Sequence, residues 1–156
     1  MPKVIVNSTP LISLIALDKL DILRDLYSEI IIPTAVYDEI SVKDNFTLLQ
    51  HDWIKVKEIT NEVAKGAFTT ALHEGEVEVL ILAKEISADL VIIDDGLARK
   101  HAKYLGIELT GTIGILLKAK ENGFINEVKC YLDKLVENNF YISNSIYDKI
   151  LKLTNE

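Results

Sequence analysis

Short hydrophobic runs rich in β-branched residues recur along the chain, and each gives way to a polar residue or a proline before helical periodicity begins. They lie at residues 4–6, 30–32, 90–93 and 107–109. Runs of this length are typical of strands, and their alternation with helical stretches indicates βαβ units. Because most of them are apolar on both faces, they fit a sheet that helices cover on both sides. The pattern therefore predicts an α/β fold with a mostly parallel sheet.

The residues between these runs predict where the helices begin. Thr9 is a good N-cap for the first helix, with Pro10 at the first helical position, where its missing N–H costs nothing. Residues 44–58 fit either a short edge strand or an ordered loop. Further helices are expected after Pro33 and at 61–72, 75–86, 97–105 and 113–120, with two amphipathic helices in 125–153 that break near 138–139.

Composition narrows the class of protein. The chain has 156 residues, of which 49% are hydrophobic and 26% are charged, and this excludes a disordered or coiled-coil chain. We expect one domain over residues 1–156, with the helical segment at about 125–153 packed on it. Cys130 is the only cysteine, which suits a reducing compartment. No apolar run approaches the roughly 20 residues of a membrane span, so we expect a soluble, cytoplasmic protein.

Polar side chains follow two of the predicted strands directly. Asn7 comes after the run at 4–6, and Asp94 and Asp95 come after the run at 90–93. Ligands of open parallel sheets bind outside the carboxyl ends of the strands, so these residues mark a candidate site. Taken alone, Asp95 reads as a helix N-cap. Two adjacent aspartates are more than one cap needs, and we expect at least one to turn toward the edge of the sheet.

Helix geometry selects two glutamates. Glu76 shares a face with Val79 and Leu80, since residues three and four apart lie on one side of a helix. Glu78 lies on a mixed face with other acids. In the helix after Pro33, Glu39 stacks over apolar residues and is the better inward candidate. As alternatives, Glu76 could complement the helix dipole in the first turn, and Glu39 could be a boundary residue with its carboxylate in water.

Carboxylates that converge on one site are stabilised by a bound cation. Buried carboxylates raise one another's pKa values until some take up protons, unless a bound ion compensates their charge. A set of oxygen ligands without His or Cys at metal spacing suits Mg²⁺ or Mn²⁺ rather than Zn²⁺. Such ions lower the pKa of bound water and neutralise charge on a phosphodiester.

Five ordered blocks of the sequence resemble the PIN-domain proteins, and most closely the PIN-like relatives of VapC toxins. The blocks are VIVNSTPLISL, IIIPTAVYDEI, LHEGEVEVLILAKE, DLVIIDDGLARKHAKYLGI and GTIGILLKAKENGFI. The resemblance implies a three-layer α/β/α fold with about five strands and metal-dependent cleavage of single-stranded RNA by an acidic quartet. The family's four acids fall in order on Asn7, Glu39, Glu76 and Asp95, with Asp94 beside the last.

The resemblance also implies partners and supporting residues. A hydroxyl that often follows the first acid falls on Ser8 or Thr9. Thr112 matches a small polar position that helps to hold the fourth acid, although an N-cap for the helix at 113–120 is the simpler interpretation. The family implies RNA as the substrate, an antitoxin protein as a possible partner, and a homodimer.

This chain departs from the family at Asn7, where the usual aspartate is replaced by an amide. Asn offers a metal one carbonyl oxygen but no charge, so a divalent ion should bind more weakly. We therefore keep a catalytically weak or inactive RNA- or protein-binding module as the alternative to a ribonuclease. A receiver-like phosphoacceptor domain also places acids at strand ends, but the sequence lacks the well-placed lysine that it needs.

The charge balance bears on RNA binding in two ways. There are 17 Lys and Arg against 24 Asp and Glu, a net charge of −7, which argues against a general nucleic-acid binder. Cations bound among the carboxylates would reverse the sign locally. Arg99, Lys100 and Lys103 could hold a substrate phosphate, although a salt bridge from Arg99 to Asp95 is the simpler expectation.

Overall fold

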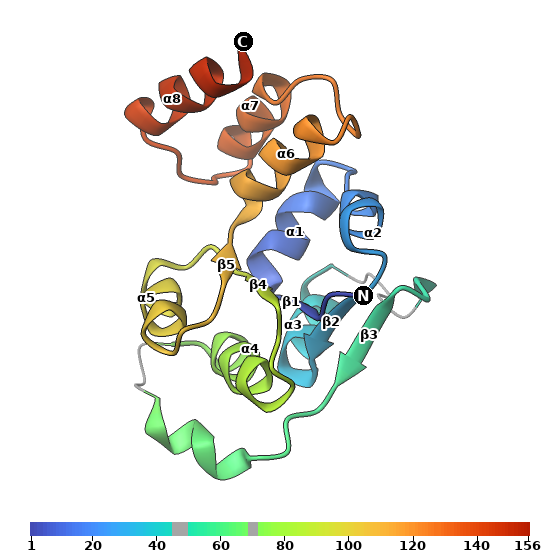
Figure 1. Cartoon of the computed structure of the whole chain (residues 1–156), viewed down its shortest axis with the longest axis vertical. Coiled ribbons are helices and arrows are strands. Elements are labelled where there is room, and N and C mark those ends of the chain that lie inside the picture. The colour runs from blue at the N-terminus through green and yellow to red at the C-terminus, as the bar shows by residue number, and fades with distance from the viewer. Residues whose placement is uncertain (45–49, 69–71) are drawn as a thin grey trace.

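The computed structural model describes residues 1–44, 50–68 and 72–156 (Figure 1). Its strands are β1 (Val4–Val6), β2 (Ile30–Pro33), β3 (Ile54–Lys57), β4 (Leu90–Ile92) and β5 (Leu109–Thr110). Its α-helices are α1 (Ser8–Ala16), α2 (Asp21–Tyr27), α3 (Thr34–Asp44), α4 (Glu74–Glu85), α5 (Gly96–Tyr104), α6 (Thr112–Glu121), α7 (Lys129–Glu137) and α8 (Asn144–Thr154). A 3-10 helix, η2, covers Glu62–Ala67.

The five strands form one parallel sheet in the order β3-β2-β1-β4-β5. At the centre of the sheet Ile5 pairs with Ile31 on one side and with Val91 on the other. The connections run outward from β1 to β3, and the chain then returns to place β4 on the opposite side of β1. The strand order therefore reverses between β1 and β4, and the carboxyl ends of these two strands border a switch point, where open sheets bind ligands.

Helices cover both faces of this sheet, which confirms the predicted α/β class. Helix α6 contacts α1 and α2, while α4 contacts α5, β1 and β2 (Figure 1). Helix α3 contacts α4 and also reaches α1. The central strands are apolar on both faces because both faces are covered, and Ile5, Val6 and Ile92 are completely buried.

Some of the predicted boundaries change, and one open alternative is decided. The first helix begins at Ser8, so Asn7 and not Thr9 occupies the N-cap position, and the Asn7 side chain makes no capping hydrogen bond. The prediction for Thr9 was wrong because Ser8 already has helical geometry. Within 44–58, residues Ile54–Lys57 form the edge strand β3. The helix expected at 61–72 is the shorter η2, and residues 69–71 of that range, like 45–49, lie outside the described residues.

The C-terminal helices pack beside α6, as Figure 1 shows at the end of the chain. Leu132 and Leu135 of α7 are buried, as is Ile150 of α8. The Glu156 carboxylate accepts the backbone N–H of Val128 at 2.9 Å and binds the Lys120 ammonium at 2.9 Å. In residues 1–44, 50–68 and 72–156 there is no helix long and apolar enough to cross a membrane.

Candidate functional site

The switch point brings Asn7 beside the residues that follow β4. The Asn7 backbone N–H donates to the Ile92 carbonyl at 3.0 Å, which continues the β1–β4 pairing to the end of both strands. Asn7 is 4% exposed, and its extended backbone leads directly into α1. The side chain does not cap α1, so the helix cap does not occupy its amide group.

Glu76 approaches the same edge from the first turn of α4. Its Oε1 accepts the backbone N–H of His73 at 3.2 Å, while Oε2 is buried with no hydrogen-bond partner in the described part of the chain. Burial raises the pKa of Glu76, the neighbouring Asp95 carboxylate raises it further, and the His73 N–H partly opposes this. A buried carboxylate oxygen next to a second carboxylate is unfavourable unless a proton or a cation lies between them.

Asp95 both caps a helix and pairs with Glu76. Its Oδ2 accepts the backbone N–H of Ala98 at 2.9 Å, so it is the N-cap of α5. Its carboxylate is also the charge that acts on Glu76. Asp95 is exposed, whereas Glu76 is only 6% exposed. The pair therefore has one buried and one accessible member, and a ligand can reach it from solvent at the Asp95 side.

A second buried polar atom without a partner lies beside Gly75, the residue before Glu76. The Ser8 hydroxyl oxygen has no hydrogen-bond partner among residues 1–44, 50–68 and 72–156, and Ser8 is 4% exposed. Gly75, the residue before Glu76, comes close to it: a Cβ on Gly75 would lie 3.7 Å from Ser8 Oγ and 3.8 Å from Asn7 Oδ1. The beginnings of α1 and α4 thus gather Asn7, Ser8 and Glu76 around Gly75.

Asp94 is engaged elsewhere. Thr112 donates its backbone N–H to Asp94 Oδ1 at 2.8 Å and its hydroxyl to Oδ2 at 2.5 Å. Burial raises the pKa of Asp94, and the hydrogen bonds from Thr112 and the nearby Arg99 guanidinium lower it in part. Gly111 allows this approach, because a Cβ there would lie 2.6 Å from Asp94 Oδ1. Asp94 therefore ties β4 to the beginning of α6.

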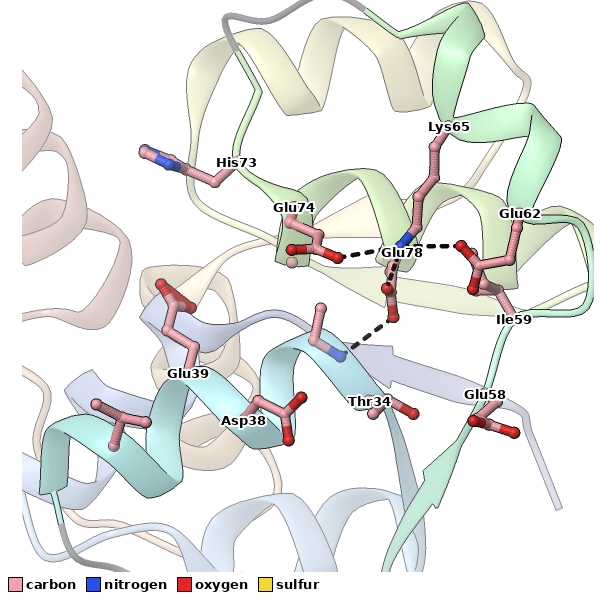
Figure 2. A pocket seen from close by; sticks show the side chains of 13 residues that line it. Thr34, Asp38, Glu39, Glu58, Ile59, Glu62, Lys65, His73, Glu74 and Glu78 are labelled. Carbon is pink, nitrogen blue, oxygen red and sulfur yellow. Dashed lines mark hydrogen bonds and ion pairs between the residues drawn. The ribbon is translucent and has the colours of Figure 1, made fainter.

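Glu39 lines a pocket on the other side of Gly75, with a volume of about 640 Å³. In Figure 2 its side chain rises from α3 on the side that faces the first turn of α4. Three of the other five acids of the pocket gather around one ammonium group: Lys65 binds Glu78 at 2.9 Å and Glu62 and Glu74 at 3.1 Å each (Figure 2). Glu39 thus borders the site across Gly75.

The sequence matches a known family of domains. A family model described as a PIN domain matches residues 3–156. The chain belongs to the PIN-domain family. PIN domains are generally nucleases and typically use divalent metal ions. No curated protein matches the chain.

Two expectations about the PIN-domain site change in the structure. Thr112 is the first residue of α6 and not its N-cap, which is Gly111, and Thr112 holds Asp94 where the family resemblance implied the fourth acid on Asp95. The Arg99 guanidinium does not turn to Asp95; it donates to the Ile93 carbonyl at 2.9 Å, because the end of β4 lies beside it.

The remaining candidates, Thr9 and Lys103, lie on the surface of the protein. Thr9 is exposed in the first turn of α1, and Lys103 is exposed two turns along α5 from Asp95. Within the described ranges, no three Asp, Glu, His or Cys side chains come together as a metal-holding group. Of the sequence-predicted residues, Glu76 and Asp95 lie together, and Asn7 lies at the same edge of the sheet with its Oδ1 beside Gly75.

Sequence reasoning also missed Glu78. It is 5% exposed, accepts the Ala35 N–H at the beginning of α3 at 3.1 Å, and pairs with Lys65. Its mixed helical face suggested an exposed side chain, and the burial comes from α3 and η2, which are distant in sequence. The available signal was the third acid in EGEVE, which a single helix dipole does not require.

Proposed function

We propose that the protein is a metal-dependent endoribonuclease that hydrolyses phosphodiester bonds of single-stranded RNA at the Glu76–Asp95 pair. The observation that carries the proposal is Glu76 Oε2, a buried carboxylate oxygen with no partner among the residues described, beside a second carboxylate. An unpaired buried anion of this kind is stabilised by a cation. PIN-domain membership makes nuclease chemistry the use that this arrangement best supports.

The donor atoms at this edge fit Mg²⁺ or Mn²⁺. Glu76 and Asp95 supply carboxylate oxygens and Asn7 supplies an amide oxygen, and oxygen-only sets are what these ions prefer. When bound, such an ion supplies an acidified water and neutralises charge on the phosphodiester. With Asn7 in place of an acid, the site has one negative charge fewer, so we expect weaker binding than a site with three carboxylates would give.

The chain's own residues have separate tasks in this proposal. Glu76 and Asp95 hold the ion, and the α5 N-cap hydrogen bond fixes the Asp95 carboxylate in place. The buried Ser8 hydroxyl is free to orient a water or a substrate oxygen at the beginning of α1. Asp94 and Thr112 act by positioning, because they fix the end of β4 from which Asp95 projects.

The test is hydrolysis of single-stranded RNA in Mn²⁺ by the wild type and by the Glu76→Gln/Asp95→Asn double variant. We expect the double variant to lose about 100-fold or more in rate, since metal-ion stabilisation of the transition state is worth several kcal/mol. Glu74→Gln is the matched control, because Glu74 lies on the same helix but binds Lys65. A wild type that cuts no faster than the double variant would refute catalysis at this pair.

Metal binding is measured separately by calorimetric titration with Mn²⁺. Asn7→Asp restores the missing charge and should tighten binding, while Glu76→Gln should abolish it. Equal Mn²⁺ affinities for the wild type and Asn7→Asp would exclude Asn7 as a ligand. RNA binding without cleavage, even by Asn7→Asp, would favour a catalytically inactive RNA-binding module.

The family resemblance also supports a toxin role with an antitoxin partner. We therefore propose that the nuclease activity arrests growth when it is not neutralised. Induced expression of the wild type should slow growth, and expression of Glu76→Gln/Asp95→Asn at the same level should not. Equal growth of both strains would refute the toxin role without bearing on cleavage in vitro.

A further inference from the structure

Helix α5 is the positively charged element next to the candidate site. Between Gly96 and Tyr104 it carries Arg99, Lys100 and Lys103 and no acid, in a chain whose net charge is −7. It begins directly after Asp95, so its charges extend away from the Glu76–Asp95 pair. On the neighbouring helix, the Lys84 ammonium donates to the Leu105 carbonyl at 3.2 Å and adds a further positive charge beyond the end of α5.

A groove with a volume of about 470 Å³ lies between α5 and the end of η2. It is lined by Ala67, Phe68, Lys100, His101, Tyr104 and Leu105. The Phe68 and His101 rings lie 5.8 Å apart, centroid to centroid, with a tilt of 57°. Tyr104 is one turn beyond His101 and is 90% exposed. The groove therefore combines flat rings with an ammonium group, the two elements that bind single-stranded nucleic acid.

The opposite side of the site repels phosphate. The pocket beside Glu39 is lined by six carboxylates, and Lys65 is already bound to three of them. An RNA strand that leaves the Glu76–Asp95 pair in that direction would place its phosphates among these acids. Along α5 it meets lysines instead. Repulsion from the acids and attraction to the lysines therefore favour an RNA path over α5.

We propose that the groove of Phe68, His101 and Tyr104 stacks a base of the single-stranded RNA substrate, while Lys100 contacts the adjoining phosphate. At a rise of about 1.5 Å per residue, His101 is about 9 Å along the helix axis from Asp95, so the groove lies within reach of a strand bound at the Glu76–Asp95 pair. The proposal rests on the proposed ribonuclease function for its substrate. It adds a subsite that the acids at the strand ends do not provide.

The test measures stacking apart from cleavage. An RNA oligonucleotide that contains 2-aminopurine is titrated with protein in EDTA, and quenching of the base fluorescence reports stacking. Tyr104→Ala should raise the Kd by about fivefold or more, the lower end of what a stacked base contributes. Tyr104→Phe keeps the ring and should bind as the wild type does. Tyr141→Ala is the control, since Tyr141 is 86% exposed and lies between α7 and α8.

Lys100→Gln tests the phosphate contact in the same assay. It should make the negative slope of log affinity against log salt shallower by about 0.7, the value for one phosphate contact on a single strand. The proposal fails if the wild type gives no quenching, if Tyr104→Ala binds as tightly as the wild type, or if Tyr104→Phe falls as far as Tyr104→Ala. Quenching that depends on Tyr104 without cleavage in Mn²⁺ would leave the groove intact and refute the nuclease proposal.

Discussion

The contact between Asp94 and Thr112 provides a sharp test of how the site is built. Thr112→Val keeps the shape of the side chain and removes the hydroxyl that donates to Asp94 Oδ2 at 2.5 Å. Thr112 is completely buried, so solvent cannot replace this donor without a rearrangement. We expect the variant to fold and to be less stable.

The magnitude follows from the partners that Asp94 keeps. A hydrogen bond to a charged group contributes about 1.5–3 kcal/mol. The Thr112 backbone N–H remains bound to Oδ1 at 2.8 Å and the Arg99 charge stays nearby, so we expect the free energy of unfolding to fall by about 1–2 kcal/mol. For a chain of this length, this corresponds to a decrease in Tm of about 2–8 °C.

The pH dependence separates this hydrogen bond from a general packing defect. Burial raises the pKa of Asp94 above its value of 3.8 in the unfolded chain, so the folded state loses stability as pH rises through the folded pKa. Without the hydroxyl the folded pKa rises further, because a group that favoured the charged form is gone. The loss in Thr112→Val should therefore be full at about pH 8 and smaller at about pH 5.

The assay is differential scanning calorimetry of the wild type and Thr112→Val at both pH values, without divalent ions. Thr9→Val is the control, because Thr9 is exposed and its change should have little effect at either pH. An unchanged Tm at about pH 8 would refute the reasoning. An equal loss at both pH values would show that packing, and not the bond to a charged Asp94, accounts for the effect.

Two further predictions concern other carboxylates. In EDTA at about pH 8, Glu76→Gln should raise the Tm, because burial and the Asp95 charge raise the Glu76 pKa. The gain in Tm should shrink toward about pH 5. A calorimetric Tm that does not rise at about pH 8 would contradict this prediction. Burial opposes ionisation of Glu156, but N–H donors of Lys129 and Val128 and the Lys120 ammonium lower its pKa to about 2. The urea midpoint of the wild type should therefore exceed that of Glu156→Gln at about pH 7, and the excess should disappear as pH falls from about 4.5 toward 2; a constant excess would contradict this assignment.

The fold could be predicted from local sequence patterns because hydrophobic residues recur at different spacings in strands and in helices. The runs at 4–6, 30–32 and 90–93 became β1, β2 and β4, since three or four consecutive apolar residues fit a strand covered on both faces. The weak point was the helix boundary at Thr9. Asn, Ser and Thr are all good N-caps, and these three residues follow one another. The sequence therefore does not decide which residue begins the helix, and tertiary packing does.

The sequence by itself determined that Asn7 and Asp95 lie at the same edge of the molecule, because strands that end in polar residues and belong to one parallel sheet share that edge. It could not determine which aspartate meets Glu76. Asp94 turns to Thr112, 18 residues further along the chain, and Asp95 turns to α4. Likewise Glu78 is buried because α3 and η2 close over it. The orientation of a side chain depends on partners that only the tertiary structure brings within hydrogen-bonding distance.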